Sequence, residues 1–94
     1  MAMKQVLIID ETPLFRDYVK DKLSTDKIVV ETALNRYDGA KKMHSILPDL
    51  LILDATFSFE ELLDFLVRKA ANPNTSKIPV ILSGPVLEHG QIAQ

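Results

Sequence analysis

Two four-residue stretches of the chain, Val6–Ile9 and Leu50–Leu53, contain apolar residues only. A strand with one face in water alternates apolar and polar residues, and a run this short is not long enough for a helix. We therefore expect strands over 4–10 and at 50–54 that are buried on both faces, as in a parallel sheet covered by helices. Two further strands are predicted from β-branched runs, one from residue 28 to about 33 and one over 78–83.

Between these strands, apolar residues recur every three or four positions, which is the spacing of amphipathic helices. The predicted helix starts are Thr12-Pro13, with Thr12 as the cap and Pro13 as the first residue, then Asn35, and then the Ser58-x-x-Glu61 capping box of a helix over 59–71. The residues expected to face the core are, helix by helix, Phe15, Tyr18, Val19 and Leu23; Tyr37, Ala40, Met43, Ile46 and Leu47; and Leu62, Leu63, Leu66, Val67 and Ala70.

The alternation of strands and helices predicts one α/β domain over residues 1–94. Short connections between alternating elements imply right-handed crossovers, and therefore a doubly wound parallel sheet with helices on both faces. With the strand order 2-1-3-4, the first and third strands would lie side by side and the fourth would lie next to the third.

The composition of the chain argues against several classes of partner and of site. Eleven basic and thirteen acidic residues are scattered along the 94 positions, and hydrophobic residues make up 47% of them. No basic run suggests nucleic acid or an anionic membrane as a partner, and the lack of cysteine excludes disulfides and thiolate metal sites. No apolar run approaches the length of a membrane span and no signal peptide is visible, so we expect a cytoplasmic protein.

Polar residues stand at the carboxyl ends of three predicted strands: Asp10-Glu11, Asp54 and Ser83. In a doubly wound sheet, ligands bind outside these strand ends, where the strand order reverses. Three crowded carboxylates recruit a cation, and oxygen ligands suit Mg²⁺. A carboxylate beside Mg²⁺ can act as a nucleophile in phosphoryl transfer, with a nearby hydroxyl holding the phosphoryl oxygens.

Each of these features has a plainer interpretation by itself. Asp10-Glu11 could be acidic residues favoured by the dipole of the following helix, and Asp54 could be a capping residue. His44 and His89 have no partners at metal-ligand spacing and are interpreted as solvated. The few glycines form no phosphate-binding loop.

Three segments together resemble the receiver domain of bacterial two-component response regulators: VLIIDETPL, PDLLILDAT and IPVILSG. The resemblance covers residues 4–94. It implies that Asp54 is the phosphoacceptor and that Asp10, Glu11 and Asp54 hold Mg²⁺ together with the backbone carbonyl of Thr56. It also implies that Ser83 contacts the phosphoryl group, that the donor is a histidine kinase or phosphotransfer protein, and that the domain is a switch rather than an enzyme.

The sequence departs from the family pattern at several points. Glu11 stands where the family commonly has Asp, and Phe57-Ser58 where it often has Met-Pro. The family continues through a fifth strand, a Lys that pairs with the phosphoryl group and a fifth helix, whereas this sequence ends at Gln94. We therefore expect the fourth strand to be an open edge that favours dimerisation or a swap of the C-terminal segment.

Two other functions fit the same residues. One is a degenerate receiver that acts only as an interaction or dimerisation module, which Glu11 and the altered loop would allow. The other is a Mg²⁺-dependent phosphohydrolase with an Asp nucleophile. It is the weaker hypothesis, because such enzymes usually carry a second Asp two residues after the nucleophile, and Thr56 stands there.

Overall fold

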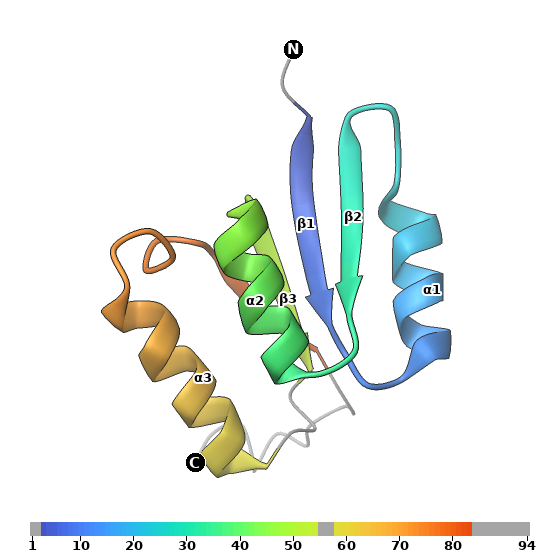
Figure 1. The fold of residues 1–94 in the computed structure, drawn as a ribbon. Helices are drawn as coiled ribbons and strands as arrows, with labels where there is room; N and C mark the ends of the chain where they lie inside the picture. The colour runs from blue at the N-terminus through green and yellow to red at the C-terminus, as the bar shows by residue number, and fades with distance from the viewer. Residues whose placement is uncertain (1–2, 55–57, 84–94) are drawn as a thin grey trace, which may run out of the picture.

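The computed structural model describes residues 3–54 and 58–83. Four parallel strands form one sheet in the order β2-β1-β3-β4, as the sequence predicts. Figure 1 shows α1 beside β2, and α2 and α3 together on the other side of the molecule. The elements are β1 (Lys4–Ile9), α1 (Pro13–Leu23), β2 (Ile28–Ala33), α2 (Arg36–Ile46), β3 (Leu50–Asp54), α3 (Phe59–Ala71) and β4 (Val80–Ser83).

The two apolar runs occupy the central strands and are buried on both faces. Leu7 and Leu53 pack in the cluster beneath α2 and α3, whereas Ile8 and Ile52 pack in the cluster beneath α1. Leu7, Ile8 and Leu53 have no exposed surface. Each such side chain contributes about 1.5–3 kcal/mol through burial, so the central pair of strands anchors the fold and fixes where these strands end.

Two of the three predicted helix caps are present. Asn35 Oδ1 accepts a hydrogen bond from the Asp38 N–H at 2.9 Å, and Ser58 Oγ accepts one from the Glu61 N–H at 3.2 Å. Thr12 precedes α1 as predicted, but its side chain makes no capping bond. The Thr12 N–H instead donates to Asp10 Oδ1, so the corner between β1 and α1 is organised by the aspartate.

The predicted core faces of the helices are partly wrong. In α3 the buried residues are Phe65 and Lys69, with Leu62 and Leu66 partly buried, whereas Leu63 and Val67 are 48% and 58% exposed and Ala70 is also exposed. The helix is therefore rotated by about one residue from the predicted face, and the stem of Lys69 takes a core position. Tyr18 and Tyr37, predicted to be buried, are 62% and 72% exposed, and Leu47 is 48% exposed.

The connection from α3 to β4 is held by Thr75, which is fully buried. Its hydroxyl donates to the Lys69 carbonyl at 2.8 Å and so satisfies one of the unpaired groups at the helix end. β4 begins at Val80, two residues later than predicted. Pro79 stands just before it and accepts a hydrogen bond from the Leu51 N–H through its carbonyl at 2.9 Å.

Within the described ranges, β4 pairs with β3 alone. Ile81 and Leu82 are each 52% exposed, although the residues opposite them in β3, Ile52 and Leu53, are buried. The predicted dimerisation through this edge stays a prediction, and the C-terminal segment expected to swap lies outside the described residues.

Candidate functional site

Asp10 is held at the end of β1 by three hydrogen bonds. Its N–H donates to the Ala33 carbonyl at 3.1 Å, which continues the pairing with β2 by one residue. Its Oδ1 accepts from the Thr12 N–H at 2.7 Å, an Asx-type turn. Its carbonyl accepts from Arg16 Nη1 at 2.6 Å. The side chain is buried, with the residue 5% exposed, so the carboxylate has a fixed place at the strand end.

Asp54 is the last residue of β3 and lies beside Asp10. Ile9 is paired with Leu53 in the parallel register, so the next residue of each strand comes alongside the other, at the usual strand separation of about 4.8 Å. Asp54 is 4% exposed. A buried carboxyl group at the carboxyl end of a central strand, where ligands bind in doubly wound sheets, is a candidate for chemistry.

Ser83 completes the row of polar residues from the side of β4. It is paired with Asp54 in the register of β3 and β4 and is partly buried. The structure therefore brings Asp10, Asp54 and Ser83 to one edge of the sheet, as the sequence predicts.

The structure does not place the other two predicted site residues, Glu11 and Thr56, in this row of strand ends. Glu11 is exposed at the start of the turn into α1, and Thr56 lies outside the described residues. In the part of the chain that the structure describes, no three His, Asp or Glu side chains are grouped in a way that could hold a metal ion. Of the four residues predicted to hold Mg²⁺, namely Asp10, Glu11, Asp54 and Thr56, the structure buries two at the strand ends, Asp10 and Asp54.

Two neighbouring buried carboxylates still fit a Mg²⁺ ion. Mg²⁺ in proteins is usually held by one or two carboxylates and keeps several waters. A cation stabilises carboxylates that stand at adjacent strand ends, so the donor set suits the ion that the sequence predicted.

Arg16 is a residue near the site that sequence reasoning missed. Its guanidinium reaches back to the Asp10 carbonyl, and the residue is partly buried. The available signal was its spacing, because a residue in the first turn of α1 can reach the strand end that precedes the helix. Of the two histidines, His44 is exposed on α2, and His89 lies outside the described residues.

Curated proteins with a similar sequence are known from two bacteria. A protein-glutamate methylesterase/protein-glutamine glutaminase of Oleidesulfovibrio alaskensis is 34% identical over 88 residues, which cover 92% of this chain and 24% of that protein. A protein of the same description from Nocardioides sp. is 30% identical over 91 residues, which cover 95% of this chain and 24% of that protein. The chain thus spans about a quarter of the length of these relatives. No family model matches the sequence.

Solved structures decide the fold. The signal receiver domain of a DNA-binding response regulator from Colwellia psychrerythraea superposes with a TM-score of 0.81 at 23% identity, over 96% of this chain and 75% of that one. The chemotaxis protein CheY4 of Vibrio cholerae gives a TM-score of 0.82 at 20% identity, over 98% and 77% of the two chains. The chain has the receiver-domain fold. The resemblance inferred from the sequence segments is confirmed, and the three polar strand ends lie on this receiver scaffold.

None of the helices among the described residues is long and apolar enough to cross a membrane.

Proposed function

We propose that this receiver domain is a phosphoacceptor switch of a two-component signalling system, with Asp54 as the residue that accepts the phosphoryl group. The observation that carries the proposal is the strand register, which sets Asp54 between Asp10 on one side and Ser83 on the other. Structural neighbours described as response-regulator receivers support the same assignment.

The chemistry requires one carboxylate oxygen of Asp54 to act as the nucleophile. In transfer from a phosphohistidine donor, this oxygen forms the new P–O bond while the P–N bond breaks, and the electron pair returns to the imidazole of the donor. The product is an acyl phosphate on Asp54. The donor would be a histidine kinase or a phosphotransfer protein.

The neighbouring residues have separate roles in this proposal. The Ser83 hydroxyl can donate a hydrogen bond to a phosphoryl oxygen and so link the modified Asp54 to β4. Asp10 and Asp54 would hold the Mg²⁺, with Glu11 close enough in sequence to act through bound water. Mg²⁺, when bound, offsets negative charge on the phosphoryl oxygens. Arg16 donates to the Asp10 carbonyl and so helps to fix the backbone that carries this carboxylate.

Binding of beryllofluoride, a phosphoryl mimic, tests the proposal directly. We expect the ¹H–¹⁵N spectrum of the domain to change on addition of beryllofluoride only when Mg²⁺ is present, with the largest shifts at the ends of β1, β3 and β4. Asp54→Asn should abolish the response, because the amide cannot act as the ligand that the carboxylate provides. Incubation with acetyl phosphate and Mg²⁺ should add the mass of one phosphoryl group to the wild-type chain and not to this variant.

Asp49→Asn is the matched control, because Asp49 stands just before β3, at the opposite end from Asp54. Its Oδ2 accepts the Gln5 N–H at 2.8 Å, an interaction that an amide oxygen can keep. This variant should respond like the wild type. An unchanged spectrum in the wild-type chain would refute the phosphoacceptor proposal and leave a degenerate receiver, which binds partners without modification.

A further inference from the structure

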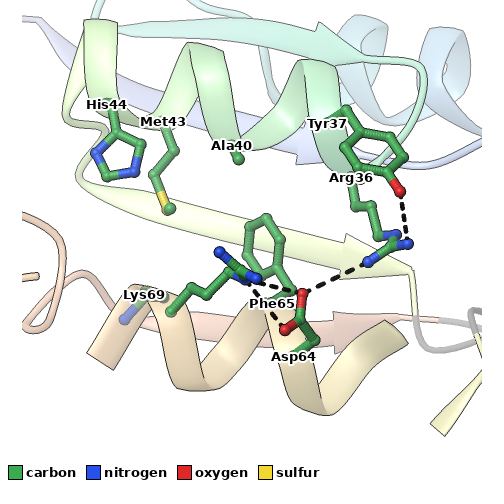
Figure 2. Close-up of a pocket in the computed structure, with 9 residues that line it drawn as sticks. Arg36, Tyr37, Ala40, Met43, His44, Asp64, Phe65 and Lys69 are labelled. Carbon is green, nitrogen blue, oxygen red and sulfur yellow. Dashed lines mark hydrogen bonds and ion pairs between the residues drawn. The ribbon is translucent and has the colours of Figure 1, made fainter. Parts of the chain in front are cut away.

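Two ion pairs join α2 to α3 across the groove that separates the outer parts of the two helices. The groove has a volume of about 600 Å³ and is lined by residues of both. Arg36, the first residue of α2, reaches across it: its Nε lies 3.1 Å from Glu61 Oε2, and its Nη1 lies 3.6 Å from Asp64 Oδ2. Figure 2 shows Arg36 and Asp64 turned toward each other in front of β3. We call these two ion pairs the α2–α3 link.

The α2–α3 link lies toward the edge of the sheet that carries the proposed phosphoacceptor site. α2 follows the carboxyl end of β2 and α3 follows that of β3, and both Arg36 and Glu61 belong to the first turn of their helix. Ser58, which caps α3, comes four residues after Asp54 in the sequence. Its hydroxyl donates to Glu61 Oε1 at 3.1 Å. The carboxylate that pairs with Arg36 is therefore also attached to the start of α3.

Each side chain of the link has a second partner on its own helix or cap. These bonds are Ser58 Oγ to Glu61 Oε1 at 3.1 Å, Arg68 Nε to both oxygens of Asp64 at 3.0 Å, and Arg36 Nη2 to the Tyr37 hydroxyl at 2.8 Å. Opening the link would therefore leave none of its three side chains without a hydrogen bond. Both carboxylates are 46% exposed, and ion pairs in contact with water are weak, so opening costs little.

Modification of Asp54 would change the charge at the strand end that precedes α3. A phosphoryl group adds negative charge, and acidic side chains close to it are repelled. The first turn of α3 carries two such side chains, Glu60 and Glu61. The added charge would push this turn away from the strand end, and the pair between Glu61 and Arg36 would be disturbed first because it joins the turn to another helix.

We propose that the α2–α3 link is a latch, closed when Asp54 is unmodified and opened when Asp54 carries a phosphoryl group. This inference rests on the proposed function and adds a route by which the modification reaches the helical face. After opening, Arg36 would stay on the Tyr37 ring, which its guanidinium faces at 4.6 Å from the centroid. Tyr37 is 72% exposed, so the change in the first turn of α2 would reach the protein surface.

Titration of the full 94-residue chain with beryllofluoride in the presence of Mg²⁺ tests the latch, with ¹H–¹⁵N spectra recorded for the wild type and for Arg36→Met. In the wild type we expect shifts at the strand ends and also in the first turn of α2. In Arg36→Met the shifts at the strand ends should remain, whereas those in α2 should be largely lost. Because this variant has no latch to open, it should bind beryllofluoride about two- to fivefold more tightly than the wild type.

Arg68→Met is the matched control, because the pair between Arg68 and Asp64 lies within α3. It should keep the shifts in α2 and the affinity of the wild type. Glu61→Gln keeps an oxygen for the Ser58 hydroxyl and removes the charge that pairs with Arg36, so it should behave like Arg36→Met and replaces that variant if thermal melting shows it to be unstable.

The outcomes separate the latch from the function on which it rests. Shifts at the strand ends without shifts in α2 of the wild type would overturn the latch and leave the phosphoacceptor function in place. Shifts in α2 of equal size in the wild type and Arg36→Met, or an affinity that Arg36→Met leaves unchanged or weakens, would do the same. A spectrum that beryllofluoride leaves unchanged everywhere would refute the phosphoacceptor function and the latch with it.

Discussion

The two faces of the sheet are covered to different degrees, although the strands between them are apolar on both sides. Beneath α2 and α3, the buried cluster includes Met43 and Phe65, which come from the helices themselves. Beneath α1, the buried residues that the structure describes come from the strands, and α1 adds the partly buried Val19 and Leu23. Figure 1 shows α1 lying along β2, near the end of the strand order.

This difference separates what strand sequences determine from what helix sequences determine. An unbroken apolar strand requires cover on both faces, but it does not specify how deeply a covering helix inserts its side chains. α2 and α3 each bury a side chain in the cluster on their face of the sheet, whereas the side chains that α1 packs on the other face stay partly exposed. We therefore expect mutations beneath α2 and α3 to cost more stability than equivalent mutations beneath α1.

The largest expected effect comes from truncating one helical side chain that packs on each face. Phe65→Ala should lower the free energy of unfolding by about 3–4 kcal/mol, because it removes a buried aromatic ring and leaves a cavity. Val19→Ala should cost about 1 kcal/mol, since its side chain is only partly buried. Urea unfolding followed by circular dichroism measures both, and equal losses would show that the two faces are equally well packed.

Gly39 gives a second measure of how closely α2 lies on the sheet. A Cβ at this position would clash with Ile9 Cδ1 and stand 2.6 Å from Ile9 Cγ1 and 3.0 Å from Ile9 Cγ2, so either the buried Ile9 side chain or the helix must move to accept it. Gly39→Ala should destabilise the fold by about 2 kcal/mol through overpacking, although alanine is favoured over glycine in a helix by about 1 kcal/mol.

Ser45→Ala is the control in the same helix, because Ser45 is exposed and the substitution should change stability by no more than about 0.5 kcal/mol. If Gly39→Ala were as stable as the wild type, α2 would be free to shift, and the close packing of this face would be a wrong description.

The sequence was sufficient for the strands and for most helix limits because those signals are local. The runs at Val6 and Leu50 predict buried strands without reference to any partner, and the caps at Asn35 and Ser58 bind backbone groups three residues away. The alternation of elements predicted a parallel sheet, and the strand order 2-1-3-4 that was assumed for it is the one observed. These predictions place Asp10, Asp54 and Ser83 at one edge of the sheet, which agrees with the strand register.

The rotation of the helices could not be predicted in the same way. In α3, two adjacent stripes are both apolar, one containing Leu63 and Val67 and the other containing Leu62 and Leu66. The structure buries the second stripe with Phe65 and accepts Lys69 in the core, because the long stem of lysine packs like an apolar chain while its ammonium reaches the Ser76 carbonyl. The contact of Arg16 with Asp10 was missed for the same reason, since it depends on where α1 settles.

The smallest expected effect on stability comes from the ammonium group of Lys69, which is buried on the face covered by α2 and α3. Lys69 is 6% exposed, and burial lowers its pKa from the ordinary value of 10.5 because the cation loses its hydration. The native state therefore holds the proton less tightly than the unfolded chain does. Below the native pKa both states are charged and the cost of burial is complete. Between the native pKa and 10.5 the unfolded state binds more protons, so the stability of the wild type rises with pH in that window.

Lys69→Met keeps the stem and removes the charge, and the exposed Ser76 can turn its carbonyl to water. We expect the variant to be more stable than the wild type near neutral pH by about 1 kcal/mol or less, with the difference shrinking as the pH is raised towards 10.5. Urea unfolding of both chains at several pH values measures this. A difference that stays constant with pH would mean that the ammonium of Lys69 is as well hydrated in the folded domain as in the unfolded chain. In that case the last turn of α3 would not be closely packed against the sheet. The two faces of the sheet would then differ less in packing than the burial of Phe65 and the close approach of Gly39 to Ile9 indicate.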